Sequence, residues 1–285
     1  YGQPLLTEAG TYSYDRSKWR RFVLSTEAHN TIMVDGLPQA RRGLRETYQA
    51  TAPLEGVFAT GEVFDWCVGR YTDGYGLDRL PVTHERTVIF VRPDYYLVID
   101  RLLDAEGEHS YEALFNLDAA DATVAEDGLT VSGTDPGEPN LTLIPLATEG
   151  LSLRIVRGQE EPIVLGWVPR ENHRQIPTAV YAKTGPTPQL MVTLMVPHPT
   201  EEVPAVEAEL LAQTDEMLAI RVRHDGAEET ILYAFDGPMA LAAGGVSADA
   251  RLVIARRAAD GTVSGGLLGG TDLRIDGQPV PVTGE

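Results

Sequence analysis

The stretch RTVIFVRPDYYLVIDRLL, residues 86–103, contains two apolar runs separated by Arg92-Pro93-Asp94. Both runs are rich in Val, Ile, Leu, Phe and Tyr, the side chains that suit a pleated, half-buried surface. Proline presets the φ angle that a tight turn requires. The stretch therefore predicts a β-hairpin, and it sets the pattern by which the rest of the chain is interpreted.

The same pattern recurs on both sides of this hairpin. HSYEALFNLD (109–118) alternates apolar and polar residues, as a half-buried strand does. MLAIRVRHDGAEETILYAF (217–235) predicts a second hairpin with Asp225-Gly226 in its turn. VEAELLAQ (206–213) is the only segment that could be a short helix, and it could equally be a strand. We predict an all-β fold, a twisted antiparallel β-sandwich with additional C-terminal β-hairpins.

The positions of proline and glycine residues suggest where the chain is divided into domains. VPHPTEEVP (196–204) is the best internal boundary, because it holds three prolines and two glutamates. We predict a sandwich over residues 1–200 and a C-terminal β-strand region over 201–285, either separate or part of the same domain. GGLLGG (265–270) is predicted as a turn. The opening YGQPLLTEAG (1–10) has the pattern of the second half of a strand, so we expect the chain to be a piece of a longer protein.

Length and composition exclude several classes of protein. With 285 residues and 43% apolar content the chain can bury a sizeable core. No apolar run approaches the ~20 residues of a membrane-spanning helix, and no signal peptide opens the sequence. The single cysteine, Cys67, excludes an intramolecular disulfide. That is typical of a reducing compartment, or of a bacterial envelope protein that does not rely on disulfides.

The net charge of −19 argues against nucleic acids and membrane surfaces as partners. Charge is nevertheless unevenly distributed, because residues 1–50 carry a net +2 and residues 51–285 carry −21. The basic residues of the first segment are Arg16, Lys18, Arg20, Arg21, Arg41, Arg42 and Arg45. Such a segment is either a local anion-binding surface or a solvated strand face, and composition alone leaves both possibilities open.

The histidines offer little chemistry when each is taken singly. His198 lies in the proline-rich loop and His224 in a hairpin turn, so both are expected to be solvated. His84 shares a strand face with Arg86, which favours a structural hydrogen bond. His173 lies in the polar loop VPRENHRQIP, which could contact a sugar or be an ordinary surface loop. The sequence contains no HExxH, CxxC, GxSxG, P-loop or dinucleotide-binding fingerprint. Only residues 5–45 combine a carboxylate, a histidine, aromatics and clustered arginines, which suggests an anionic-ligand site.

The order of residues in that region resembles a known family. PLLTEAGTYSYDRSKWRRFVLSTEAHNTIMVDGLPQ (4–39) is similar to the signature of the heparinase II/III-like polysaccharide lyases, in their C-terminal β-sandwich module. The shared pattern is an acidic residue, Gly-x-Tyr-x-Tyr, a basic-aromatic stretch, Ala-His-Asn-Thr, an apolar strand and Asp-Gly. In this chain the pattern falls on Glu8, Gly10 to Tyr14, Arg16 to Phe22, Ala28 to Thr31, and Asp35-Gly36. A looser likeness extends to about residue 200.

The resemblance implies a function for a longer protein. The family cleaves uronic-acid-containing glycans, either heparin/heparan sulfate-like or alginate-like, by β-elimination. A base removes the proton α to the uronate carboxylate, and cations or amides stabilise the charge that develops. The family's tyrosine and asparagine for this chemistry lie on a preceding α/α-toroid domain, so no catalytic residue is expected here. We expect the isolated chain to be inactive, its partners to be that toroid and an acidic polysaccharide, and its location to be the bacterial periplasm, envelope or exterior.

The resemblance also implies a structural zinc ion. Position by position, His29 and Glu8 would be two protein ligands, and a third would come from a His-x-His-x-Asp stretch upstream of residue 1. Glu8 is one methylene longer than the aspartate usual in the family. The residues implied to face the substrate are Tyr12, Tyr14, Arg16, Arg20, Arg21 and Asn30. Asn30 is the ambiguous one, because an asparagine there can also cap the strand.

Two other functions remain open from the sequence. The chain could be a non-catalytic carbohydrate-binding module that holds glycans through residues 12–45 without a metal ion. It could also be a structural β-domain in which the N-terminal charges are solvated and His29 is satisfied by the core.

Overall fold

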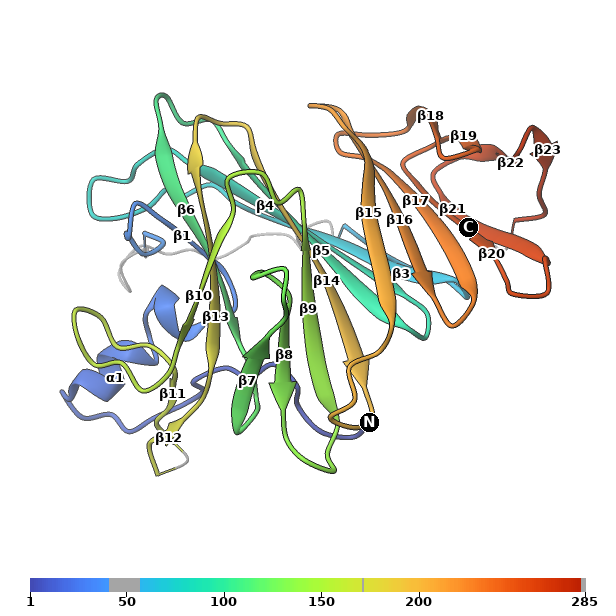
Figure 1. Ribbon diagram of the computed structural model, residues 1–285. Coiled ribbons are helices and arrows are strands. Elements are labelled where there is room, and N and C mark those ends of the chain that lie inside the picture. The colour runs from blue at the N-terminus through green and yellow to red at the C-terminus, as the bar shows by residue number, and fades with distance from the viewer. Residues whose placement is uncertain (41–56, 171, 283–285) are drawn as a thin grey trace. The chain divides into compact units, whose positions relative to one another are not determined.

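The computed structural model describes residues 1–40, 57–170 and 172–282. Arg41, Arg42 and Arg45 of the basic segment therefore lie outside the described residues. The described part is almost entirely strands, which confirms the all-β prediction (Figure 1). Its helices are α1 (Lys18–Phe22) and the 3-10 turn η1 (Thr26–Ala28). Among the described residues, no helix is long and apolar enough to cross a lipid bilayer.

The chain forms two compact units. Unit 1 comprises residues 1–56, 69–86 and 99–203, of which residues 41–56 are not described, and unit 2 comprises residues 57–68, 87–98 and 204–285. The strands β3, β4 and β5 contribute residues to both units. The chain is therefore divided not only near residue 203 but also within these three strands.

Unit 1 contains a four-stranded antiparallel sheet with the order β1-β6-β13-β10. Its strands are β1 (Ile32–Val34), β6 (His109–Asn116), β13 (Thr178–Gly185) and β10 (Ser152–Val156). A small two-stranded sheet joins β11 (Trp167–Val168) to β12 (Arg174–Gln175). Because β1 pairs with β6, with Ile32 opposite Ala113, the segment that leads into β1 is fixed against the body of this sheet.

An eight-stranded sheet has the order β2-β3-β4-β5-β14-β9-β8-β7. Its strands are β2 (Phe58–Thr60), β3 (Phe64–Tyr71), β4 (Thr83–Val91), β5 (Tyr95–Leu103), β14 (Gln189–His198), β9 (Asn140–Leu146), β8 (Val131–Thr134) and β7 (Asp121–Val124). Buried Thr87, Ile89 and Val91 alternate along β4 with half-buried residues, which is the period of two that a pleated strand imposes. The hairpin predicted at 86–103 is thus confirmed as β4 and β5.

The core of unit 1 lies between two sheets. Tyr111 and Tyr181 from the four-stranded sheet are no more than 1% exposed, and they belong to one apolar cluster with Leu102, Val131 and Leu143 of the eight-stranded sheet. Side chains from two facing sheets that fill one core define a β-sandwich. The predicted sandwich is confirmed.

Unit 2 contains two further antiparallel sheets, with the orders β15-β16-β17-β20-β21 and β18-β19-β22-β23. Their strands are β15 (Val206–Gln213), β16 (Met217–His224), β17 (Ala227–Ala234), β20 (Leu252–Arg257), β21 (Val263–Leu268), β18 (Met239–Ala243), β19 (Val246–Ala250), β22 (Thr271–Ile275) and β23 (Gln278–Pro279). Leu232 and Val253 of the first sheet share an apolar cluster with Leu241 and Ile275 of the second. The predicted C-terminal hairpins therefore carry a core of their own.

Three local predictions are wrong. Residues 1–10 form no strand, since only Leu6 makes an isolated bridge, to Leu117. GGLLGG is not a turn, because most of it lies in β21. His198 and His224 are not solvated but are 3% and 8% exposed. Each of these histidines is buried with a hydrogen-bonding partner on another strand, Thr142 of β9 for His198 and Glu229 of β17 for His224.

Candidate functional site

Glu8 and His29 lie side by side in unit 1, although 21 positions separate them in the sequence. The backbone brings them together, because Ala9 N donates to Ala28 O over 3.3 Å and Thr7 N donates to Asn116 O over 2.9 Å. His29 follows the 3-10 turn η1, and its Nδ1 contacts Glu8 Oε2. Both side chains are about half exposed, at 46% and 48%. A carboxylate oxygen and an imidazole nitrogen thus meet at the surface, and both are donor types that bind zinc in proteins.

Hydrogen bonds hold the Glu8 carboxylate in its charged form. Its Oε1 accepts from Asn30 N at 3.2 Å and from Asn30 Nδ2 at 2.9 Å. Burial opposes ionisation of Glu8, but the hydrogen bonds from His29 and Asn30 outweigh it and lower the pKa of the carboxyl. Glu8 is therefore ionised and oriented at neutral pH, as a metal ligand must be.

Asn30 fixes this arrangement by using its whole amide. Its Nδ2 donates to Thr7 O and to Glu8 Oε1, both at 2.9 Å, and its Oδ1 accepts from Asn116 N at 2.7 Å. The side chain is thus bound on three sides by the protein. This geometry suits a residue that positions Glu8 and caps β1 better than one that reaches out to a ligand.

A buried ion network lies under Asn30. Arg86 Nη1 donates to Asn30 O, while Arg86 Nε and Nη2 donate to the two oxygens of Asp100 at 2.6 and 2.9 Å. His84 Nε2 also bonds to Asp100 Oδ1 at 2.6 Å. Burial opposes ionisation of Asp100, yet Arg86 and His84 lower the pKa of that carboxyl. The structural role predicted for His84 is thus confirmed, and the network continues to the backbone next to His29.

The predicted basic-aromatic surface is organised by α1. Ser17 caps the helix, since its Oγ accepts from Arg20 N at 3.2 Å. Tyr14, which precedes the cap, is 91% exposed. The Arg20 guanidinium lies 4.8 Å from the centre of the Tyr14 ring. Arg21 Nη1 donates to Arg16 O at 3.5 Å, so these two predicted residues are also neighbours. Arg20 and Arg21 lie in the last turn of the helix, where positive charge is favoured.

An aromatic cluster that the sequence did not predict lies beside these residues. Trp19 of α1 packs 4.6 Å from the His173 ring and 5.1 Å from Trp167 of β11, measured between ring centroids. Tyr12 Oη lies 3.3 Å from His173 Nε2, which ties the predicted tyrosine to the same cluster. In Figure 1, α1 accordingly lies next to β11 and β12. The only sequence signal was that Trp19 interrupts a run of cations and that His173 lies in a polar loop.

Gly10 joins the Glu8 pair to the aromatic cluster. Its φ is +69°, and a Cβ at this position would lie 2.9 Å from Nη1 of Arg170. Only glycine combines that backbone angle with such a close approach. Arg170 therefore lies against the segment between Glu8 and Tyr12 and adds another cation to this side of unit 1.

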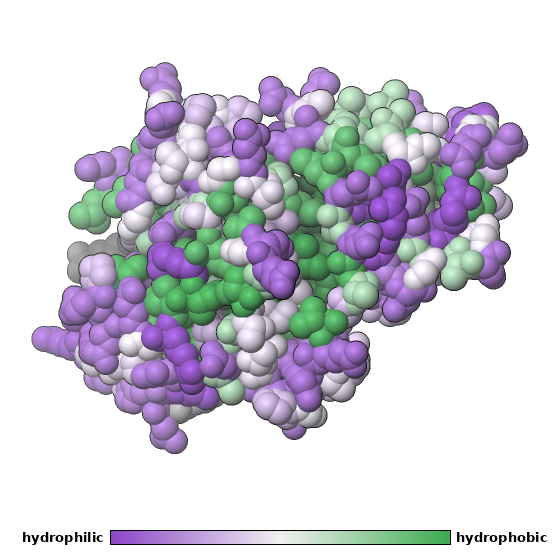
Figure 2. Space-filling view, viewed as in Figure 1, coloured by the Kyte–Doolittle hydropathy of each residue, from purple (hydrophilic) through white to green (hydrophobic). Residues whose placement is uncertain are grey.

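On the face drawn in Figure 2, apolar residues gather in connected areas with hydrophilic residues around them. One surface pocket of unit 1 combines both kinds, since it is lined by Arg21 and Arg79 together with Leu24, Leu37 and Leu77. Leu77 and Leu24 are among the exposed large apolar residues. Arg21 thus faces a partly apolar hollow beside α1.

Metal ligands also gather at a second place. In the described part of the chain, a group of three potential ligands occurs only at Asp94, His224 and Glu229, in unit 2. None of these residues was predicted as a ligand. Glu8 and His29 lie together, and no third potential ligand joins them among the described residues, so their role as metal ligands stays a prediction.

Comparison with known proteins places the chain in a family. The family model "Heparinase II/III-like, C-terminal" matches residues 1–209. No curated protein matches the sequence. Among solved structures, the heparan sulfate lyase HepC from Pedobacter heparinus has a TM-score of 0.62 and 20% identity, and the match covers 82% of this chain and 35% of that one.

A structure of heparinase III has a TM-score of 0.58 and 15% identity, and the match covers 82% of this chain and 34% of that one. At these identities the likeness shows the fold, and the chain spans about a third of the length of these neighbours. The family match itself covers most of the sequence and includes all the residues of the Glu8, His29 and α1 region. The chain belongs to the heparinase II/III-like C-terminal domain family.

Proposed function

We propose that this chain is the β-sandwich module of a polysaccharide lyase that cleaves uronic-acid-containing glycans, of the heparan sulfate or alginate type, by β-elimination. The family match over residues 1–209 is the observation that carries this proposal. The neighbouring structures of a heparan sulfate lyase and of heparinase III support it through the fold. We place the parent protein in the bacterial envelope or outside the cell.

The role proposed for the chain is to bind and orient an acidic glycan. Tyr12, Trp19 and His173 offer ring faces and edges on which sugar rings can stack, and Arg20 and Arg21 offer positive charge for uronate or sulfate groups. Cations beside a uronate carboxylate make its α proton easier to remove, because they stabilise the negative charge that develops. In this proposal the base and the acid come from another part of the parent protein, so the isolated chain binds glycans without cleaving them.

We further propose that Glu8 and His29 are ligands of a structural zinc ion. Their adjacent donor atoms, the lowered pKa of Glu8 and the clamp formed by Asn30 fit such an ion. Two protein ligands hold zinc weakly, so we propose that a third comes from outside this chain. Zinc bound there would neutralise the carboxylate and fix the segment that leads into β1. Arg86 would hold the backbone of that segment from below.

Glycan binding by the chain tests its proposed role. Calorimetric titration with heparan sulfate and alginate oligosaccharides should give binding to at least one of them, and a neutral glucan should give none. Tyr14→Ala and Arg20→Ala should each weaken binding several-fold. Arg257→Ala is the matched control, because Arg257 is an exposed cation of unit 2 that pairs with Asp276. Equal losses in Arg20→Ala and Arg257→Ala, with no loss in Tyr14→Ala, would show that net charge, and not the surface around α1, determines binding.

The same titration separates the lyase proposal from its alternative. Adding a chelator should weaken glycan binding if zinc fixes the segment around His29. Binding that is unchanged by the chelator and by His29→Ala, in a parent protein that cleaves none of these glycans, would favour a non-catalytic carbohydrate-binding module.

A further inference from the structure

Three potential metal ligands converge in unit 2. His224 ends β16 and Glu229 lies on β17, and the two strands are joined by the tight turn at Asp225-Gly226. Asp94 lies in the turn between β4 and β5. The family match ends at residue 209, so His224 and Glu229 lie beyond it. The cluster is thus a feature of this chain that neither the family nor the proposed lyase function explains.

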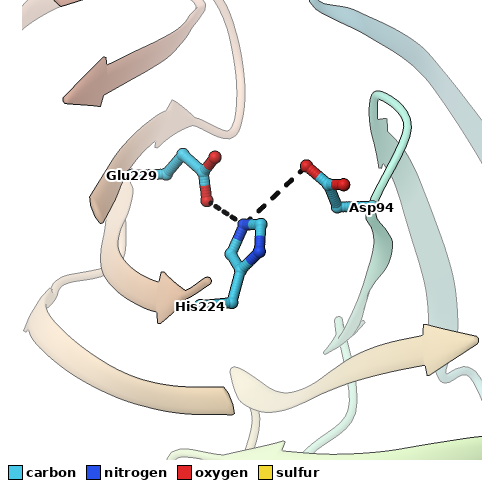
Figure 3. Close-up of side chains that lie close together, drawn as sticks. All are labelled: Asp94, His224 and Glu229. Carbon is cyan, nitrogen blue, oxygen red and sulfur yellow. Dashed lines mark hydrogen bonds and ion pairs between the residues drawn. The ribbon is translucent and has the colours of Figure 1, made fainter. Parts of the chain in front are cut away.

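The geometry suits a small cation. His224 Nε2 lies 2.9 Å from Glu229 Oε2 and 3.8 Å from Asp94 Oδ2, and all three donor atoms lie within 4.8 Å of one another. Figure 3 shows that one ring nitrogen of His224 points between the two carboxylates. A tetrahedral zinc ion bonded at about 2.0–2.2 Å keeps its donor atoms roughly 3.4 Å apart. The three atoms can therefore reach one ion with small side-chain movements.

Other residues hold the two carboxylates in place. Tyr95 Oη donates to Glu229 Oε2 at 3.1 Å, and Arg256 Nη2 donates to Asp94 Oδ2 at 2.9 Å. Arg256 Nε also pairs with Glu229 Oε1 at 3.0 Å. Hydrogen bonds of this kind orient the carboxylates at metal sites. Apart from its contact with His224 Nε2, each donor oxygen accepts one hydrogen bond, so an ion in place of the proton on that nitrogen would find a lone pair on both oxygens.

The charge balance calls for one more cation. Two carboxylates and one guanidinium leave a net charge of −1 when His224 is neutral, at a place where Glu229 is 0% exposed. Buried charge without compensation is strongly disfavoured. Glu229 Oε1 also lacks a well-directed hydrogen bond despite its ion pair with Arg256, so the guanidinium does not complete the site. Either a proton on His224 or a metal ion at the same nitrogen supplies the missing charge.

Solvent reaches the cluster from one side. His224 lines a groove of unit 2 together with Glu207, Arg223, Glu228 and Arg257, and the Asp94 side chain is 26% exposed. Arg223 is neutralised by Glu228, to which its Nε donates at 2.8 Å, so it does not repel an entering cation. The groove reaches His224 but not Asp94 or Glu229, and the exposed part of Asp94 is where the cluster itself meets solvent.

From this geometry we propose that Asp94, His224 and Glu229 bind a divalent transition-metal ion of the zinc class, with water as the remaining ligand. Imidazole and carboxylate together suit such ions. Because Arg256 offsets one of the two negative charges, the site is weaker than one with two unpaired carboxylates. The ion would tie the β4–β5 turn to the β16–β17 hairpin.

Zinc titration of the chain tests this site separately from Glu8 and His29. In the His29→Ala background, calorimetry with Zn²⁺ alone and metal analysis after dialysis should still find about one zinc ion per chain. Asp94→Asn and His224→Gln should each weaken that binding at least tenfold. Asp225→Asn is the matched control, since it removes a nearby exposed carboxylate that is not a proposed ligand, and it should leave the affinity unchanged.

A Co²⁺ titration gives a second readout, because a four-coordinate site should produce visible absorption that His224→Gln abolishes. Circular dichroism confirms folding, and if His224→Gln fails to fold then Asp94→Asn decides the question. No zinc in the His29→Ala protein, or equal affinity in Asp94→Asn, would overturn the proposal. In that case the carboxylates of the cluster would be balanced by protonated His224 and by Arg256, without a metal ion. A failure to bind glycans would contradict the proposed function but would not affect this metal-site proposal, which is tested with Zn²⁺ alone.

Discussion

Arg86 and Asp100 form a bidentate ion pair inside unit 1, with Nε to Oδ1 at 2.6 Å and Nη2 to Oδ2 at 2.9 Å. The Asp100 side chain is 2% exposed, so its charge depends on this partner and on His84. The third guanidinium nitrogen of Arg86 donates to Asn30 O, next to His29. The pair therefore connects the buried interior to the candidate zinc ligands at the surface.

Arg86→Met should destabilise the protein by about 3 kcal/mol, because it leaves the Asp100 carboxylate buried without its main counter-charge. Arg154→Met is the control, since Arg154 is 43% exposed in its pair with Glu112 and should contribute at most about 1 kcal/mol. Urea denaturation of both variants measures the difference. Similar losses would show that Asp100 does not depend on Arg86.

His109 and Asp35 should make stability depend on pH. His109 Nδ1 lies 2.7 Å from Asp35 Oδ2, and that hydrogen bond raises the pKa of His109. Burial opposes ionisation of Asp35, but the Ser110 backbone and His109 lower the pKa of its carboxyl. The histidine contribution is complete below its ordinary pKa of 6.5 and is lost as the pH rises through the higher folded value. The aspartate contribution is present above 3.8 and is lost as the pH falls through the lower folded value.

The pair should therefore stabilise most between about pH 4 and pH 6.5. Denaturation across the pH range compares the wild type with His109→Gln, and the difference between the two proteins should shrink on both sides of this window. A difference that stays constant from pH 4 to pH 9 would contradict the assignment.

Gly10→Ala should destabilise the protein by more than the backbone angle alone explains. A left-handed residue other than glycine costs roughly 1–2 kcal/mol, and a Cβ at Gly10 would also displace the Arg170 guanidinium. Gly137→Ala is the control, because Gly137 has a φ of +75° and nothing within 4 Å of a Cβ. Thermal unfolding of the two variants isolates the Arg170 contribution, and equal losses would exclude it.

Asn30→Ala should cost about 2 kcal/mol, since it removes the side-chain hydrogen bonds to Thr7 O, Glu8 Oε1 and Asn116 N together. If Asn30 positions Glu8, the same variant should also weaken zinc binding at the Glu8 and His29 pair. A zinc affinity that stays unchanged in a destabilised protein would restrict Asn30 to capping β1.

The fold could be predicted because its signals are local. Apolar and polar residues alternate along residues 86–103 and 109–118, which directly indicates the two-residue period of a β-strand. Asp225 and Gly226 have the positive φ angles, +49° and +74°, that a tight hairpin turn requires. GGLLGG is wrongly predicted as a turn, because its glycines are required by close packing against other strands and not by a turn. A Cβ at Gly265 would lie 2.4 Å from Leu273 Cδ2 and 2.7 Å from Ile254 O, so glycine is needed within the strand itself.

The candidate site was predictable only in part, because its contacts join distant segments. The adjacency of Glu8 and His29 followed from the family resemblance, which fixed the order of motifs. His173 could not be paired with Trp19 from sequence, because the two residues are 154 positions apart. Trp19 of α1 meets His173 where it also packs against Trp167 of β11. His224 is buried with Tyr95, Asp94 and Glu229 around its ring. Glu229 lies on the other strand of the same hairpin, but no local pattern indicates Tyr95 and Asp94, which are about 130 positions away in the sequence.

The most direct test of the central claim is a lyase assay of the full-length parent protein with heparan sulfate and with alginate, followed by the ultraviolet absorbance of unsaturated uronate. We predict that absorbance rises with at least one glycan, that it stays flat for the isolated chain, and that His29→Ala lowers both the rate and the zinc content of the parent. A flat trace for the folded, zinc-loaded parent with both glycans would contradict the proposed function.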